Sequence, residues 1–131
     1  MIGVAKVLGA VLLAGTVHGQ APADLTLSIR DGAGAHGPVL GTASLTCAPS
    51  GGTHPQAASA CRTLERAAGR FDRIRGRDGV CTMIYRQVTA VAYGSWDGRP
   101  VRFEKTYDNT CRLKNALAPV YDFGAGENAQ A

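Results

Sequence analysis

The residues with the clearest chemical meaning form a short segment, Cys81-Thr82-Met83-Ile84-Tyr85. A protease binds an extended peptide by pairing with its backbone and by accepting its side chains in pockets. Met83 is unbranched and apolar, and the β-branched Ile84 follows it, so an exposed pair of this kind could occupy such a cleft. The segment therefore has the chemistry of a protease substrate.

The other reactive side chains form no recognisable catalytic motif. His18 lies near the N-terminus, His36 in a glycine-rich stretch and His54 directly before a proline, and no Gly-x-Ser-x-Gly segment exists. We predict that the protein is not an enzyme and that His54 is a structural loop residue. No Cys-x-x-Cys pair supports a zinc site, and no motif supports any other metal or cofactor.

The N-terminal residues 1–19 have the pattern of a secretory signal peptide. Lys6 provides a positive start, and residues 7–17 form an apolar run that is too short to span a bilayer comfortably. We predict cleavage after Gly19, which leaves one domain over residues 20–131. The protein is expected to be secreted and extracellular, without a membrane anchor.

The charge balance is mildly basic, with a formal net charge of +4. A group of arginines could attract a nucleic acid or an anionic surface: Arg62, Arg66, Arg70, Arg73, Arg75 and Arg77. Glu65, Asp72 and Asp78 interleave with them, and no aromatic residues accompany them. The pattern favours a solvated helix face followed by a charged loop, and no nucleic-acid partner is predicted.

The chain has four cysteines, Cys47, Cys61, Cys81 and Cys111. In an exported domain of this size they imply two disulfides. Four cysteines allow three connectivities, and the spacing does not choose among them.

The first half of the domain has the pattern of a hairpin followed by a helix. Residues 25–29 and 39–47 alternate apolar with polar residues, which predicts two strands. Thr53, Pro55 and Gln56 together resemble a capping box and a first helical turn. Apolar residues then recur at helical spacing over 57–68, and Gly69 is placed to end the helix.

The second half predicts a second hairpin. Residues 71–80 are charged and glycine-rich, which indicates an exposed connection. Residues 88–95 and 101–107 have strand patterns and flank a turn at Asp97 and Gly98, with Trp96 beside it as a packing residue. A short helical turn is expected near residues 113–117, and residues 124–131 are expected to be a disordered tail. The predicted fold class is α+β, with a five-stranded antiparallel sheet packed by one main helix.

Five groups of residues together resemble the Streptomyces subtilisin inhibitor family. They are Leu45-Thr46-Cys47-Ala48-Pro49, Gly52-Thr53-His54-Pro55, Ala60-Cys61, Trp96-Asp97-Gly98 and Asn109-Thr110-Cys111. The resemblance runs from about residue 25 to about residue 123 and keeps all four cysteines in order. It implies a secreted serine protease inhibitor that binds its target as a substrate does, and it implies the same α+β fold.

The resemblance also implies roles for single residues. Cys47 would pair with Cys61, and Cys81 with Cys111. Met83 would be the primary specificity residue, and Met83-Ile84 the reactive-site bond. The flanking residues of the protease-binding loop would be Val80, Cys81, Thr82 and Tyr85.

Three further features of the loop follow from the resemblance. Asn109 resembles the family residue that supports the loop by side-chain hydrogen bonds, although Asn is also a common turn residue. A strand that begins near Tyr85 would anchor the far side of the bond. Thr82 stands where the family often has Pro, and Thr leaves the backbone more freedom.

The side chain of Met83 narrows the expected partner to a subtilisin-like serine protease, whose pocket is broad and hydrophobic, and it could also enter a chymotrypsin-like slot. A trypsin pocket, with its buried carboxylate, is not expected to accept it. The family further implies a homodimer formed through the sheet. The alternative function is a disulfide-stapled secreted structural or adhesion module without inhibitory activity.

Overall fold

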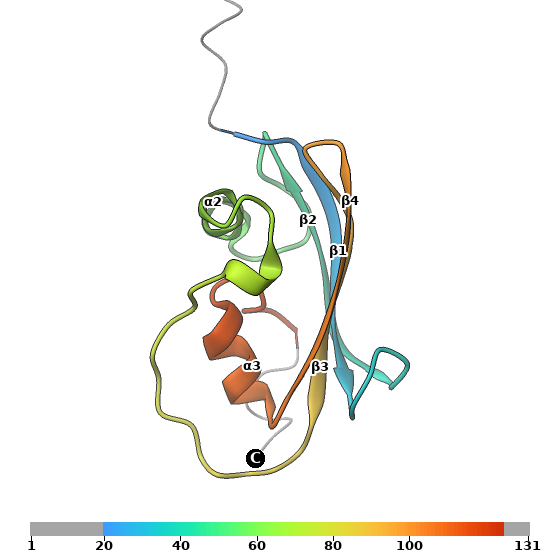
Figure 1. The fold of residues 1–131 in the computed structure, drawn as a ribbon, viewed down its shortest axis with the longest axis vertical. Helices are drawn as coiled ribbons and strands as arrows, with labels where there is room; N and C mark the ends of the chain where they lie inside the picture. The colour runs from blue at the N-terminus through green and yellow to red at the C-terminus, as the bar shows by residue number, and fades with distance from the viewer. Residues whose placement is uncertain (1–19, 125–131) are drawn as a thin grey trace, which may run out of the picture.

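The computed structural model describes residues 20–124. The predicted signal peptide, and the predicted tail beyond Gly124, lie outside the described residues. These residues form four strands, β1 (Ala23–Asp31), β2 (Val39–Cys47), β3 (Val88–Trp96) and β4 (Arg99–Tyr107). Two α-helices, α2 (Ala57–Arg66) and α3 (Thr110–Leu117), and one 3-10 turn, η1 (Phe71–Arg73), complete it. Both helices lie on the same face of the sheet (Figure 1).

The sheet is antiparallel throughout, in the order β2-β1-β3-β4. The strand alternation predicted from the sequence is confirmed, because Leu25, Leu27 and Ile29 of β1 are all buried against the helices. The predicted turn at Asp97 and Gly98 joins β3 to β4, and both residues have positive φ. One face of the sheet thus carries the apolar side chains that the helices cover.

The prediction of five strands is wrong for the described residues, which contain four. The strand expected to begin near Tyr85 begins at Val88 instead. Residues 80–87 include β-forming side chains, but β3 already pairs with β1 on one side and β4 on the other. Residues 80–87 instead hydrogen-bond to the Asn109 side chain and to the backbone of Asp108 and Gly32, so they remain a loop.

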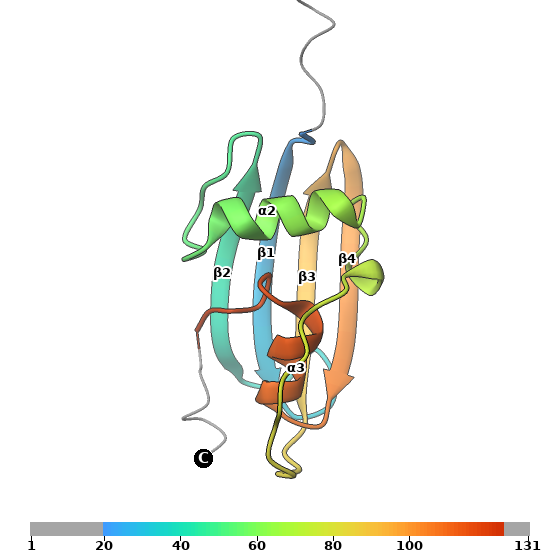
Figure 2. The same ribbon diagram turned by 90° about the vertical axis from the view of Figure 1, so that its left-hand side faces the viewer.

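Helix α2 runs across the strands near one end of the sheet (Figure 2) and buries Ala60, Cys61 and Leu64. The predicted capping box is wrong, because the helix begins at Ala57 and its N-cap, Gln56, makes no side-chain cap bond. The Thr53 hydroxyl instead accepts a 2.9 Å hydrogen bond from the Ser44 amide of β2. Thr53 therefore holds the segment before α2 against β2 and does not cap the helix.

The predicted stop of this helix at Gly69 is confirmed. Gly69 has φ +77° and its amide donates to the Leu64 carbonyl at 2.8 Å. A Cβ at this position would lie 2.4 Å from the Trp96 ring, so a larger residue would collide with the indole. Trp96 is itself buried, in agreement with its predicted packing role.

Helix α3 begins three residues before the predicted turn because Asn109 caps it. The Asn109 side-chain oxygen accepts a 2.9 Å hydrogen bond from the Arg112 amide, which satisfies one of the free amides of the first turn. Leu113 and Leu117 are buried beneath the helix. No helix in residues 20–124 is long and apolar enough to cross a membrane.

Candidate functional site

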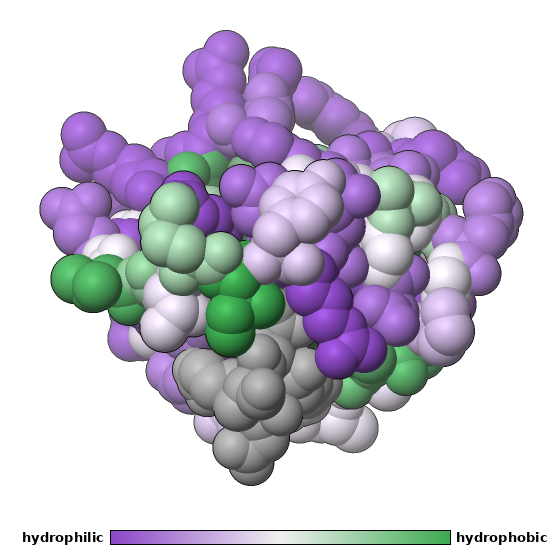
Figure 3. All heavy atoms as spheres, turned by 90° about the horizontal axis from the view of Figure 1, so that it is seen from below, coloured by the Kyte–Doolittle hydropathy of each residue, from purple (hydrophilic) through white to green (hydrophobic). Residues whose placement is uncertain are grey.

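The loop formed by residues 80–87 lies at the end of the molecule opposite α2 (Figures 1 and 2). Its apolar side chains face solvent: Val80 is 100% exposed, Met83 87% and Tyr85 71%, whereas Ile84 is 39% exposed. Seen from this end, hydrophobic side chains protrude among hydrophilic ones (Figure 3). An exposed apolar segment on a small domain is unfavourable in isolation and is typical of a binding surface.

One disulfide joins this loop to helix α3. Cys81 is bonded to Cys111 with their Cα atoms 5.8 Å apart, and the second disulfide joins Cys47 of β2 to Cys61 of α2. This is the pairing that the family resemblance implies. Cys81 lies two residues before Met83, so the disulfide fixes the loop on the N-terminal side of that residue.

Asn109 contacts the loop on both sides of Met83. Its side-chain nitrogen donates to the Ile84 carbonyl at 2.6 Å and to the Thr82 carbonyl at a longer 3.5 Å. Asn109 is only 2% exposed, and its oxygen is engaged in capping α3. The cap fixes the orientation of the amide, and the amide in turn holds the carbonyls on both sides of Met83.

Backbone hydrogen bonds hold the C-terminal side of the loop. The Arg86 amide donates to the Asp108 carbonyl at 2.8 Å, and the Gln87 carbonyl accepts from the Gly32 amide at 2.8 Å. The Arg86 side chain also forms an ion pair with Asp31 at 3.4 Å. The residues that follow Ile84 are therefore tied to both neighbours of β3.

Sequence analysis missed a second support, which lies on the N-terminal side of the loop. The Arg77 amide and side-chain Nε donate to the backbone and side-chain oxygens of Asn115, at 2.8 and 2.9 Å. The nitrogen of Asn115 lies 3.3 Å from the Cys81 sulfur. Arg77 also bonds both oxygens of Asp122, at 2.6 and 3.3 Å.

The close approach of this segment to α3 requires a glycine. Gly76 has φ +72°, and a Cβ there would lie 2.3 Å from the Asn115 carbonyl oxygen. No local signal identifies the Arg77 contacts, because the partners lie 38 and 45 residues away in the sequence. Gly76 and Gly79, on either side of Arg77, were the one signal in the sequence that the backbone passes close to another element here.

The other candidate residues lie apart from the loop. His54 is buried, and its ring nitrogens contact the Val120 carbonyl at 2.8 Å and the Gln56 amide at 2.9 Å, which agrees with its predicted structural role. Burial lowers the pKa of His54, and the Val120 hydrogen bond and the charge of Asp122 partly oppose this effect. Within residues 20–124 no group of His, Cys, Asp or Glu could hold a metal ion.

The geometry thus shows an exposed apolar loop that is fixed on both sides of Met83. Similarity to known proteins shows the family to which a chain with this loop belongs. A family model described as subtilisin inhibitor-like matches residues 21–109. The chain belongs to this family. Members of the subtilisin inhibitor-like family are protease inhibitors, and the chain is accordingly not an enzyme.

Relatives of known name extend over most of the chain. Subtilisin inhibitor-like protein 5 of Streptomyces fradiae is 41% identical over 107 residues, which is 79% of this chain and 100% of that protein. Subtilisin inhibitor of Streptomyces violaceus is 41% identical over 101 residues, or 74% of this chain and 69% of that protein.

A solved structure shows a similar fold. The crystal structure of sermetstatin from Streptomyces caespitosus, in complex with subtilisin from Bacillus licheniformis, matches with a TM-score of 0.68 and 33% identity. The match covers 78% of this chain and 99% of the sermetstatin chain. The subtilisin inhibitor-like fold therefore accounts for nearly all of the described residues.

Proposed function

We propose that this subtilisin inhibitor-like protein is secreted and inhibits subtilisin-like serine proteases, with Met83-Ile84 as the reactive bond. Sermetstatin, which has the same fold, is found in a complex with subtilisin. The observation that carries the proposal is the amide of Asn109, whose hydrogen bonds to Thr82 and Ile84 bracket Met83. Two disulfides in a domain of this size are typical of an exported protein.

The loop binds as a substrate. Met83 enters the primary specificity pocket, and Val80, Thr82, Ile84 and Tyr85 lie in neighbouring subsites. The catalytic serine of the protease then faces the Met83 carbonyl carbon, as in ordinary acyl transfer. Because the loop is already held in one conformation, binding loses little additional conformational entropy.

Inhibition follows from what happens after attack on the bond. The Cys81–Cys111 disulfide retains the N-terminal fragment, and the bonds from Asn109 to Ile84 and from Arg86 to Asp108 retain the C-terminal one. The new amine stays beside the acyl group, so religation competes with hydrolysis. The enzyme therefore returns to the intact complex rather than releasing products.

Thr82 stands where Pro is frequent in the family. Pro would restrict the backbone at this position, whereas Thr does not. The 3.5 Å contact from Asn109 to the Thr82 carbonyl and the adjacent disulfide provide other restraint. We propose that these contacts hold the loop in place of a proline.

The test is titration of subtilisin with the purified, oxidised protein, followed by sequencing of any fragment formed during long incubation at mildly acid pH. Stoichiometric inhibition with one cut at Met83-Ile84 is expected. Rapid degradation of the protein, or a cut at another bond, would refute the assignment of the reactive bond.

Exchange of the specificity residue tests the same assignment by a second route. In Met83→Lys the new ammonium would pair with the buried carboxylate of a trypsin pocket. Leaving that carboxylate buried and unpaired costs about 2–5 kcal/mol, so trypsin inhibition is expected to strengthen by roughly thirtyfold or more. Unchanged inhibition constants for both trypsin and subtilisin would contradict the role of residue 83. A chymotrypsin titration of the unmodified protein measures how far its Met is accepted by that narrower slot.

We also propose a homodimer that buries the uncovered face of the sheet. Both helices cover the other face (Figure 1), and Tyr93 on β3 is 51% exposed. Light scattering across a range of concentrations, with Tyr93→Arg as the interface variant, tests this. A monomer at all concentrations would remove the dimer and leave the inhibitor proposal intact.

A further inference from the structure

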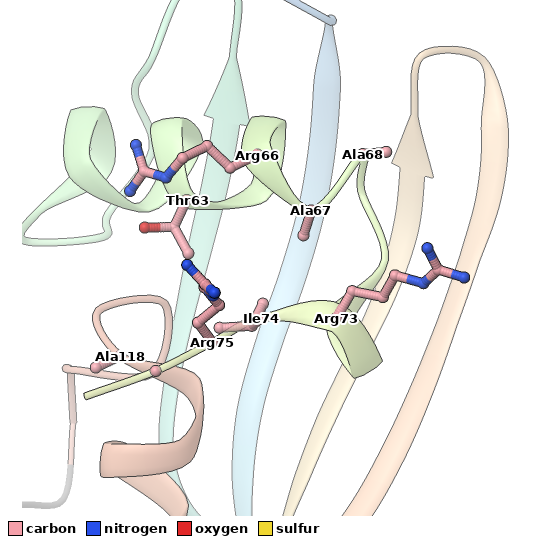
Figure 4. A pocket seen from close by; sticks show the side chains of 9 residues that line it. Thr63, Arg66, Ala67, Ala68, Arg73, Ile74, Arg75 and Ala118 are labelled. Carbon is pink, nitrogen blue, oxygen red and sulfur yellow. The ribbon is translucent and has the colours of Figure 1, made fainter. Parts of the chain in front are cut away.

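A second concave surface lies far from the protease-binding loop, between α2 and the segment that follows η1. This hollow has a volume of about 710 Å³. Its lining includes Thr63, Arg66 and Ala67 from the α2 region and Arg73, Ile74 and Arg75 from the segment that follows. We call it the arginine hollow. Figure 4 shows Arg75 extending toward Thr63 of α2, with Arg66 above, whereas Arg73 points the other way.

The arginine hollow carries positive charge without a neutralising carboxylate. None of its lining residues is acidic, and Arg66, Arg73 and Arg75 are exposed and form no ion pair with the described residues. Glu65, Asp72 and Asp78, which interleave with the arginines in the sequence, do not line the hollow. Asp72 pairs with Arg70 at 3.7 Å, and Glu65 lines a different hollow beside Trp96. The structure thus separates charges that the sequence mixes.

The chemistry of the lining selects an oxyanion. A guanidinium group presents a planar set of donors that matches the oxygens of a phosphate, and the Thr63 hydroxyl adds one more donor. Ala67 and Ile74 provide an apolar wall, beside which the field of the arginines is less screened than in open water. The volume exceeds that of a single phosphate, so several linked groups can enter.

The lining also argues against nucleic acid as the ligand. Proteins that bind single strands stack the bases on aromatic side chains, and none of the residues that line the hollow is aromatic. A phosphate polymer without bases matches the hollow better, because it requires only charge and hydrogen-bond donors.

We propose that the arginine hollow binds the phosphate groups of a linear, base-free polyanion, of which inorganic polyphosphate is the simplest example. Arg75 extends toward Thr63 of α2 (Figure 4), whereas loop 80–87 is at the other end of the molecule (Figure 1). A polymer in the hollow therefore leaves the protease-binding loop free. The inhibitor can then be retained on a phosphate-rich surface while it binds a protease.

The experiment measures the affinity of the oxidised protein for fluorescent polyphosphate between about 50 and 200 mM salt. Arg66→Ala/Arg75→Ala removes the two arginines that flank Thr63, and Ala preserves the helix. This double variant is expected to bind at least tenfold more weakly. The slope of log affinity against log salt concentration is expected to become shallower by about 1.4, which is roughly 0.7 for each lost phosphate contact.

The matched control is Arg99→Ala/Lys105→Ala, which removes the same charge from exposed positions of β4 that neither line the hollow nor pair with Tyr93. It is expected to change the affinity by less than threefold. Equal losses in the two double variants would overturn the proposal, because net charge alone would then explain binding. Absence of binding at the lowest salt, or tighter binding of a thymidine oligonucleotide with the same number of phosphates, would also overturn it. Titration of subtilisin with both variants verifies that they are folded. This control does not depend on whether polyphosphate binds.

Discussion

The two disulfides secure two regions that differ in how much else holds them. Cys47–Cys61 joins α2 to β2, a strand that is already paired with β1 along its whole length. Both cysteines are buried in the core, at 3% and 5% exposure. Removal of this disulfide leaves the sheet ladder and the apolar contacts of α2 in place.

The Cys81–Cys111 disulfide joins α3 to a loop that belongs to no strand. Besides this covalent bond, the loop depends on the Asn109 amide, the Arg77 contacts and a few backbone bonds at Arg86 and Gln87. Each of these contacts acts at a different point, so none replaces another. The core is therefore supported redundantly, whereas the loop is not, so inhibition should fail before the fold does.

The largest expected effect comes from Cys81→Ala/Cys111→Ala. On the chain-entropy model, a ring of this length restricts the chain by about 3–4 kcal/mol. If most of this restriction acts on the loop, inhibition of subtilisin should weaken by roughly 100- to 1,000-fold. The cut protein should also dissociate, so inhibition becomes temporary. Inhibition constants and the fragment pattern over time measure both effects.

The matched variant for this comparison is Cys47→Ala/Cys61→Ala. It should lower the free energy of unfolding by about 3 kcal/mol and still inhibit subtilisin within about threefold at 25 °C, where it remains folded. Urea unfolding and the inhibition constant give the two values. If both double variants lose inhibition equally, the two regions are coupled and the comparison fails.

Asn109 offers the next largest effect and separates the two functions of one side chain. Asn109→Ala removes the helix cap, which is worth about 1 kcal/mol, and both donors to the loop. Asn109→Asp keeps a good cap but has no amide donor for the Thr82 and Ile84 carbonyls. Both variants should inhibit roughly 10- to 100-fold more weakly, since about 1–3 kcal/mol of hydrogen bonding is lost.

The two Asn109 variants should differ in stability. Asn109→Asp keeps the cap but sets a buried carboxylate against the Ile84 carbonyl, so it should unfold earliest, and Asn109→Ala should unfold between it and the unmodified protein. Full inhibition by Asn109→Asp would mean that the cap alone orders the loop. Thermal unfolding and the subtilisin inhibition constant distinguish these results.

A smaller effect is expected at Arg77. Its side chain is 48% exposed, so the pair with Asp122 is partly screened by water, but Arg77→Ala also loses the bond to the Asn115 side chain. Inhibition should weaken by about three- to tenfold, equivalent to roughly 1 kcal/mol. Arg70→Ala is the control, because the Arg70–Asp72 pair is exposed and contacts no part of the loop. If Arg77→Ala behaves like Arg70→Ala, the second support has no role in inhibition.

The smallest expected effect is a pH dependence that belongs to the core alone. The pKa of His54 is lowered by burial from its usual 6.5, so the unfolded chain binds a proton more readily than the folded one. Stability is therefore complete above about pH 6.5 and declines as the pH falls from there toward the lower pKa of the folded state. The slope contributed by one proton is at most about 1.4 kcal/mol per pH unit.

His54→Gln isolates this contribution. Urea unfolding at pH 7.5, 6.5 and 5.5 should show a shallower decline for the variant than for the unmodified protein. Identical slopes would show that His54 does not titrate differently on folding. The inhibition constant should be the same for both proteins across this range, because His54 has no recorded contact with loop 80–87 in the described structure.

Local patterns were sufficient for most of the architecture. Alternation placed β1 and β2, and Gly69 marked the end of α2, because these features depend on residues a few positions apart. The fifth strand and the capping box failed where a distant partner intervened. The Asn109 side chain engaged the Ile84 carbonyl in the loop, and Ser44 of β2 engaged the hydroxyl of Thr53.

The sequence by itself determined the kind of loop this protein presents. The apolar Met83 follows Cys81 closely, and Asn109 precedes Cys111, and both features can be read directly from the sequence. Only the tertiary structure decided what holds the loop. Arg77, Asn115 and Asp122 converge from positions far apart in the chain, and the lining of the arginine hollow includes none of the carboxylates that interleave with its arginines in the sequence. Local periodicity depends on residues that are neighbours in the sequence. Side-chain hydrogen bonds and the separation of charges depend on which distant residues the complete fold brings together.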